Sequence, residues 1–205
     1  MARAPRPRVK PDACFLNIPY DDRFEKLYLA YIVGLTAHGL VPMTTLGVPR
    51  DVRRLERIFT LIQQCRYSVH DISRIQLNPG PPRAPRFNMP FELGLAVAWA
   101  SLNPQRHSWV GCDEIPHRPV RSISDLAGTD FHSHRGTVEG VLSSLCNAFV
   151  GRTPRPTVPR MKTVYRRLRR AIPDLKLNAG ANSLFEARVF NDLVVAARAL
   201  WEQLP

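Results

Sequence analysis

The sequence predicts an α/β protein with an open, mainly parallel sheet of about five strands flanked by helices. Apolar runs of strand length alternate along the chain with stretches in which apolar residues recur at helical spacing. This alternation is typical of right-handed βαβ units, whose strands run parallel. The length of 205 residues and the hydrophobic fraction of 44% are sufficient for one globular domain with an appendage.

The first strand is expected over residues 14–18, a short apolar run that ends at Pro19. From residue 22 the spacing becomes helical, with one apolar face, and Gly39 is the expected stop. A second apolar run at residues 40–45 predicts the next strand.

The middle of the domain repeats this order. Residues 51–65 predict an amphipathic helix, and residues 67–72 predict the third strand. The Pro-rich loop 73–87 is long for a compact domain, which favours a functional or mobile segment that gates the site. The helix expected at residues 90–101 is apolar nearly all round, which is typical of a helix buried against a sheet.

The last part of the domain predicts two more strands. Residues 107–112 and 129–132 read as strands, with a helical turn at 122–127 between them and a helix at 137–149 after them.

The domain boundaries follow from composition. Residues 1–12 are rich in Pro and Arg and are expected to be a disordered basic tail. The α/β domain is expected at 13–150 and a Pro-rich linker at 151–160. Residues 161–205 predict helices only, with one strongly basic face.

Composition excludes several classes of protein. No apolar run is long enough to span a membrane and no secretory h-region is present, which predicts a cytoplasmic protein without membrane contact. The four cysteines are widely spread, so buried free thiols are expected. The net charge of +12 invites a nucleic-acid partner, but much of the excess charge lies in the N-terminal tail and in one late segment, which argues against a dedicated nucleic-acid function.

Glu92 and Asp71 are the candidate catalytic carboxylates. Both are expected at the carboxyl ends of parallel strands, facing the crevice where open α/β sheets bind ligands. Pro90 favours a helix start with Asn88 or Met89 as N-cap, which puts Glu92 in the first turn, where the dipole favours its ionised form. Such a carboxylate stabilises or attacks the anomeric carbon when a sugar loses its base. Alternatively, Glu92 only complements the dipole.

Asp71 also has two interpretations. It could bind ribose hydroxyls or protonate a departing base, or it could cap the following loop through an Asx-turn. His70 is expected on the opposite face of the strand. His132 and His134 lack a third ligand at useful spacing, so no metal is expected.

Substrate-binding residues are expected at the same edge of the sheet. Asn17 and Tyr20 follow the first strand and suit a phosphate, a ribose or a base, and Asn88 would orient the ribose and leaving group. Ser73 and Arg86, in the long loop, suit phosphate contacts, although such a loop arginine could serve solubility alone. No Gly-rich phosphate loop follows the first strand, which argues against an ordinary dehydrogenase or ATPase, and no cofactor is expected.

Several ordered motifs within 13–150 carry a family resemblance. The segments FLNIPYDDRF, HDIS, NMPFELGLA and ISDLAGTD are similar to those of the nucleoside 2-deoxyribosyltransferase and Toll/interleukin-1 receptor (TIR)-like superfamily. The resemblance implies a flavodoxin-like sheet and cleavage or transfer at an N-glycosidic bond, with TIR-type members acting on NAD. Asp71 matches the family's Asp after the third strand, and Glu92, two residues before Gly94, matches its nucleophilic Glu. The Gly-Thr that usually precedes this Glu is absent, which disfavours transfer between free nucleosides.

The sequence therefore predicts an N-glycosidase, or hydrolase, of the ribosyl bond of a nucleotide, with NAD favoured as substrate, in bacterial defence or signalling. The alternative is a non-catalytic nucleotide-sensing TIR-like module that signals through the helices of 161–205. Expected partners are a small nucleotide and, because TIR-like enzymes often build their sites by assembly, further copies of the chain.

Overall fold

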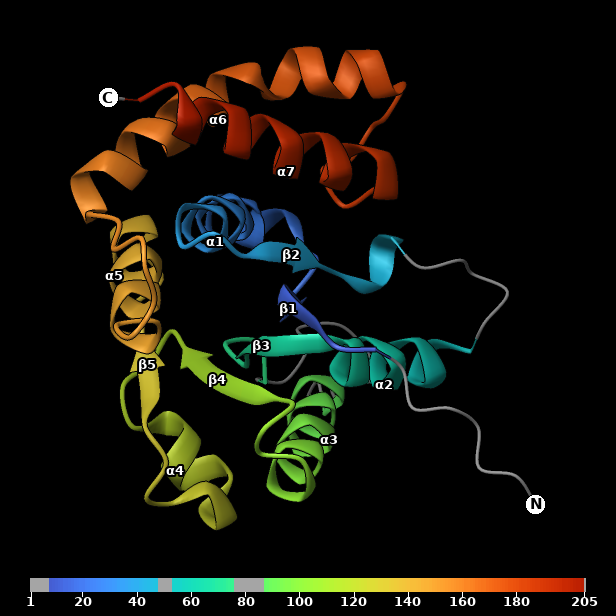
Figure 1. Cartoon of the computed structure of the whole chain (residues 1–205), viewed down its shortest axis with the longest axis vertical. Coiled ribbons are helices and arrows are strands. Elements are labelled where there is room, and N and C mark those ends of the chain that lie inside the picture. The colour runs from blue at the N-terminus through green and yellow to red at the C-terminus, as the bar shows by residue number, and fades with distance from the viewer. Residues whose placement is uncertain (1–7, 48–52, 76–86, 205) are drawn as a thin grey trace.

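The computed structural model describes residues 8–47, 53–75 and 87–204, and it has the predicted α/β architecture (Figure 1). Its five-stranded, all-parallel sheet has the order β2-β1-β3-β4-β5. This flavodoxin-like order reverses direction between β1 and β3, as the sequence predicted. The strands are β1 (Lys10–Asn17), β2 (Val41–Met43), β3 (Cys65–Asp71), β4 (Ser108–Asp113) and β5 (Phe131–Ser133).

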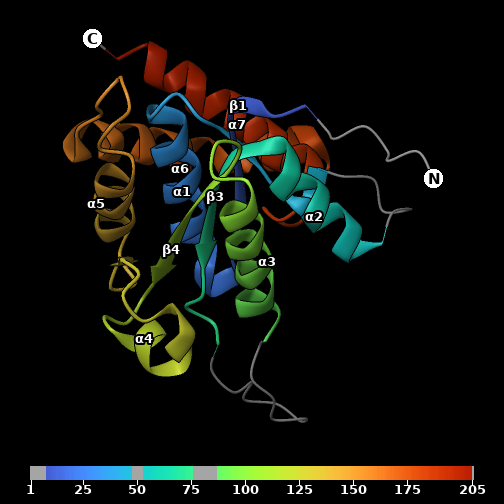
Figure 2. The same ribbon diagram turned by 60° about the horizontal axis from the view of Figure 1, so that its bottom comes forward.

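Helices cover both faces of this sheet. On one face α1 and α5 pack together, and on the other α2 and α3 lie side by side (Figure 2). The pair α6 and α7 forms a further layer outside α1 (Figure 1). The helices are α1 (Glu25–Ala37), α2 (Arg54–Gln64), α3 (Asn88–Leu102), α4 (Arg118–Ser122), α5 (Val138–Ala148), α6 (Val158–Ala179) and α7 (Ala187–Glu202), with 3-10 turns η1 (Asp22–Phe24), η2 (Thr45–Gly47) and η3 (Ser124–Leu126).

The central strand β1 is apolar in sequence because both of its faces are buried. Cys14 and Leu16 join the main core with α1 and α5. Ala13 and Phe15 point the other way and pack against α2 and α3. A strand in the middle of a parallel sheet is covered twice, so its apolar run is continuous rather than alternating.

Helix α1 is buried along nearly its whole length. Every residue from Leu27 to Ala37 is buried, although the sequence spacing predicted only one apolar face. The side of α1 turned away from the sheet is covered by α6 and α7. The Tyr28 ring lies 5.1 Å from the ring of Phe185 and 6.4 Å from that of Phe190. The C-terminal helices therefore share one core with the α/β domain.

Several boundaries differ from the prediction. Strand β1 begins at Lys10, inside the segment 1–12 that was expected to be disordered, because Lys10 pairs with Cys65 at the start of β3. Helix α6 begins at Val158, inside the expected linker 151–160. The backbone of α3 does not approach the sheet at Gly94, since a Cβ there would meet nothing within 4 Å.

Helix α6 is amphipathic rather than membrane-spanning. Its inner face buries Met161, Val164 and Leu168 in the core. Its outer face carries the exposed arginines of the predicted basic segment, namely Arg166, Arg167, Arg169 and Arg170. Within the described ranges, no helix combines the length and the apolar character needed to cross a bilayer.

Two helical glycines give opposite expectations for the same substitution. A Cβ at Gly140 would lie 2.0 Å from the carbonyl oxygen of His134, so backbone would have to move, whereas Gly94 has open space. Gly94→Ala should raise the free energy of unfolding by about 0.5–1 kcal/mol through helix propensity. Gly140→Ala should lower it by about 1–3 kcal/mol through overpacking. Urea unfolding measures both free energies. If Gly140→Ala were as stable as the wild type, the close approach of residue 140 to the His134 carbonyl oxygen would be contradicted.

Candidate functional site

The candidate site lies at the carboxyl edge of the sheet, where the strand order reverses. Asn17 is the last residue of β1 and is in register with His70 of β3. Glu92 comes from α3, the helix that follows β3. Open α/β sheets bind ligands at this reversal, so Asn17 and Glu92 occupy the predicted position.

Glu92 is buried at this edge, with 3% of its surface exposed. Helix α3 begins at Asn88 with Phe87 as N-cap, so Glu92 is its fifth residue and not a first-turn acid as predicted. The helix dipole acts mainly within the first turn. Burial is therefore the larger influence, and it raises the pKa of Glu92.

Two neighbours partly offset the burial of Glu92. The Arg54 Nη2 atom lies 3.4 Å from Glu92 Oε1, and its charge lowers the pKa of Glu92. The side chain of Asn17 lowers the pKa of Glu92 as well. The Arg54 side chain is 57% exposed, so its ion pair is screened by water. Arg54 was not among the residues predicted from the sequence. Its place as the first residue of α2, after β2, was the available signal, because that also puts it at the carboxyl edge.

Tyr20 lies close enough to Glu92 for the carboxylate charge to act on its phenol. Burial raises the pKa of this phenol to about 12, the side chains of Thr45 and Thr44 lower it, and the Glu92 charge raises it. The phenol therefore stays protonated and remains a hydrogen-bond donor at neutral pH. The Tyr20 ring also lies 5.7 Å from that of Phe185, between α6 and α7.

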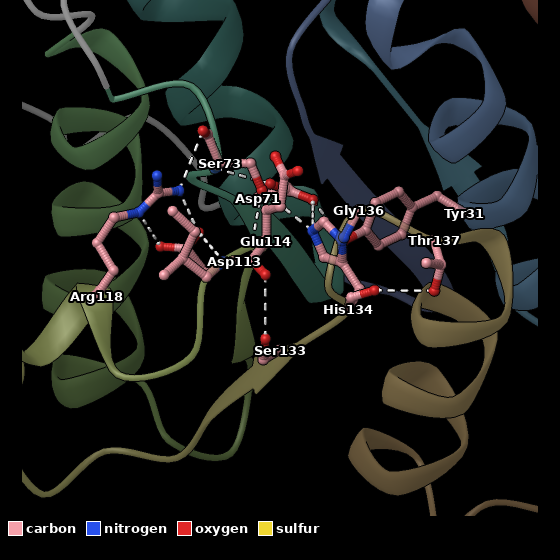
Figure 3. Close-up of polar contacts among 11 residues, drawn as sticks. Tyr31, Asp71, Ser73, Asp113, Glu114, Arg118, Ser133, His134, Gly136 and Thr137 are labelled. Carbon is pink, nitrogen blue, oxygen red and sulfur yellow. Dashed lines mark hydrogen bonds and ion pairs between the residues drawn. The ribbon is translucent and has the colours of Figure 1, made fainter.

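Asp71 is enclosed on the other face of β3 (Figure 3). It is 0% exposed and accepts three hydrogen bonds. Tyr31 Oη on α1 donates to Oδ2 at 2.7 Å, and His134 Nε2 lies 2.9 Å from the same oxygen. The Ser73 backbone N–H donates to Oδ1 at 2.9 Å, which is the Asx-turn considered as the alternative.

Ser73 and His134 complete this second network. The Ser73 hydroxyl lies 3.1 Å from His134 Nε2 and accepts the backbone N–H of Glu114 at 2.8 Å. His134 Nδ1 accepts the backbone N–H of Gly136, so Nε2 carries the proton that points to Asp71. Ser73 is thus engaged within the protein, where a phosphate-binding residue was expected.

The predicted pair of carboxylates does not meet in one crevice. Asp71 contacts α1 and the segment before α5, whereas Glu92 contacts Asn17 and Arg54. The prediction placed both on the ligand side because it used only their positions at strand ends. Successive residues of a strand face opposite sides, and Asp71 faces away from Asn17 and His70.

The remaining predicted residues lie at the rim or beyond the described ranges. Asn88 is exposed at the first position of α3. Arg86 lies outside the described residues. Arg74, at the start of the predicted loop 73–87, pairs with Asp21, with Nε 3.5 Å from Oδ2.

A groove with a mainly apolar lining runs between β2 and α7. Its volume is about 590 Å³, and side chains such as Val41, Met43 and Val194 line it. It reaches Thr44 but not Glu92 or Asn17. In the described part of the chain, no group of three or more His, Cys, Asp or Glu side chains is placed to hold a metal ion.

Comparison of the chain with protein-family models, with curated proteins and with solved structures gave no match. The functional interpretation therefore rests on the geometry around Glu92.

The enclosed position of Asp71 predicts a structural role. Asp71→Asn replaces an acceptor oxygen by an NH₂ group that faces donors, so the free energy of unfolding should fall by about 1–3 kcal/mol. Urea unfolding measures the loss, with Asp174→Asn on the exposed face of α6 as the control. Unchanged stability of Asp71→Asn would contradict the network.

The burial of Glu92 predicts a pH-dependent gain in Glu92→Gln. A raised folded-state pKa means that wild-type stability is highest below the unfolded pKa of about 4.3 and falls as pH rises through the folded value. Glu92→Gln lacks this loss, so its melting temperature should exceed that of the wild type increasingly from pH 4 to 8. Exposed Glu56→Gln should show no such trend. If the difference in melting temperature between Glu92→Gln and the wild type became smaller with rising pH, the effect of burial on Glu92 would be refuted.

Proposed function

We propose that this protein cleaves the N-glycosidic bond between ribose and base in a nucleotide, with NAD as the favoured substrate, in bacterial defence or signalling. The observation that supports this most is the buried Glu92 carboxylate at the reversal of strand order, held between Asn17 and Arg54. The motif resemblance assigns the nucleophilic role to the same residue.

Glu92 would stabilise or attack the ribose C1′ as the base departs. Positive charge develops at this carbon in the transition state, and a carboxylate stabilises it electrostatically or covalently. The effect is larger in a site of low dielectric, and Glu92 is almost fully removed from water.

Three neighbours would assist Glu92 or bind the substrate. The Asn17 side chain would favour the ionised form of Glu92, whose pKa it lowers. The Tyr20 phenol, protonated at neutral pH, is a donor for a ribose hydroxyl or a base. The exposed guanidinium of Arg54 suits a phosphate, which it can bind through two parallel N–H groups.

A second candidate function is a nucleotide sensor without catalysis. The contact between Tyr20 and Phe185 supports it, because a ligand beside Tyr20 would touch a residue of the C-terminal helical layer. A sensor would be stabilised by the nucleotide through mass action, with no product formed.

The two candidates are separated by incubating the protein with NAD and with nucleoside monophosphates and following base release by chromatography. Wild type should release nicotinamide, and Glu92→Gln should be at least about 100-fold slower, because the group that acts on C1′ is neutral. Glu56→Gln, an exposed glutamate of α2, is the matched control. Several protein concentrations are needed, since the resemblance implies sites built by assembly.

Equal rates for wild type and Glu92→Gln would refute the catalytic role of Glu92. A rise in melting temperature with nucleotide and no base release at any protein concentration would favour the sensor.

A further inference from the structure

A chain of buried polar side chains starts beneath Glu92 and runs the length of β3. It passes through Asn17, His70, Ser68 and His107 and ends at a backbone carbonyl, that of Cys65. All four side chains are buried, on the face of the sheet covered by α2 and α3. The Phe15 ring packs edge-on against His70, with centroids 5.9 Å apart, so the chain crosses an apolar layer.

The links of this chain have ordinary hydrogen-bond lengths. Asn17 Nδ2 lies 3.0 Å from His70 Nδ1, and His70 Nε2 lies 2.9 Å from Ser68 Oγ. Ser68 Oγ lies 2.9 Å from His107 Nε2. The last link joins His107 Nδ1 to the Cys65 carbonyl oxygen at 2.9 Å. Both nitrogens of each imidazole are thus engaged.

The Cys65 carbonyl sets the direction of every link, because a carbonyl can only accept. His107 Nδ1 must therefore donate, which leaves Nε2 of a neutral ring to accept the Ser68 hydroxyl. The Ser68 oxygen then accepts the proton of His70 Nε2.

The order of donors and acceptors continues from His70 through Asn17 to Glu92. His70 Nδ1 is left as an acceptor, so Asn17 must present its NH₂ group to it. The second proton of that NH₂ group is then free to point toward the Glu92 carboxylate, whose pKa the Asn17 side chain lowers. An inverted amide would instead place its carbonyl oxygen against two acceptors.

We propose that His107, Ser68 and His70 are positioning residues that fix the amide of Asn17 with its donor toward Glu92, and that the Cys65 carbonyl sets the direction of the whole chain. The importance of Glu92 itself rests on the proposed function. The chain supplies an ionised Glu92 with a donor in a buried site, where a carboxylate without partners would be neutral.

Other titratable groups act on both ends of the chain. Arg54 and Tyr20 face Glu92, and Arg66 acts on His107. Burial lowers the pKa of His70 to about 3 and also lowers that of His107, which agrees with two neutral rings.

The first test uses the unmodified protein without substrate. Long-range ¹H–¹⁵N spectra of the imidazole rings report which nitrogen carries the proton. At pH 8, His70 should be protonated at Nε2 and His107 at Nδ1, and His70 should stay neutral from pH 5 to 8. The same tautomer in both rings, or titration of His70 within this range, would overturn the proposed direction.

The second test follows the Glu92 carboxyl carbon through a pH titration of protein labelled with ¹³C-glutamate, the signal being assigned by its absence from Glu92→Gln. Ser68→Ala breaks the chain and frees the Asn17 amide to invert, so the pKa of Glu92 should rise by about one unit or more. Ser144→Ala removes a buried hydroxyl from α5, on the other face of the sheet, and should leave the titration unchanged.

An unchanged Glu92 titration in folded Ser68→Ala would overturn the positioning role. If Ser68→Ala does not fold, the tautomers of the unmodified protein decide the question. If the protein does not cleave NAD but shows the expected tautomers and titration, the proposed function is refuted and the proposed hydrogen-bonded chain still holds. If the protein cleaves NAD but the rings show other tautomers, the proposed function is supported and the proposed direction of the chain is refuted.

Discussion

The fold depends on covering α1, a helix with almost no side turned to water. A helix that is apolar all round is stable only when other elements surround it. The sheet and α5 cover one part of α1, and α6 and α7 cover the rest. The C-terminal helices are thus needed to complete the core, although a Pro-rich segment separates them from the α/β domain in sequence.

The enclosure of α1 also explains one of the two polar networks around β3. Tyr31 points from α1 into the main core, where its hydroxyl needs an acceptor, and the Asp71 carboxylate provides it. His134 and the Ser73 backbone satisfy the rest of that carboxylate, and this ties the start of α5 to the sheet. On the opposite face, His70 joins Asn17 to Ser68 in the same way. Each network is closed, as buried polar groups require.

The candidate site differs from these networks because the Glu92 carboxylate has incomplete compensation for its burial. Glu92 is buried, but its ionic partner, Arg54, is more than half exposed, and the pKa of the carboxyl is raised. A buried carboxylate of this kind reduces stability at neutral pH, and such costs are typical of functional sites. Asp71, by contrast, accepts hydrogen bonds from Tyr31, His134 and the Ser73 backbone.

The sequence by itself determined the order of strands and helices, the parallel sheet, and the place of Asn17, Tyr20 and Glu92 at its carboxyl edge. These features follow from local periodicity and from the rule that parallel strands end at one edge. Only the tertiary structure decided which face Asp71 serves, which residue pairs with Glu92, and that α6 and α7 enclose α1. Those outcomes depend on contacts between residues far apart in the chain, such as Tyr31 with Asp71 and Arg54 with Glu92, and local spacing carries no record of them.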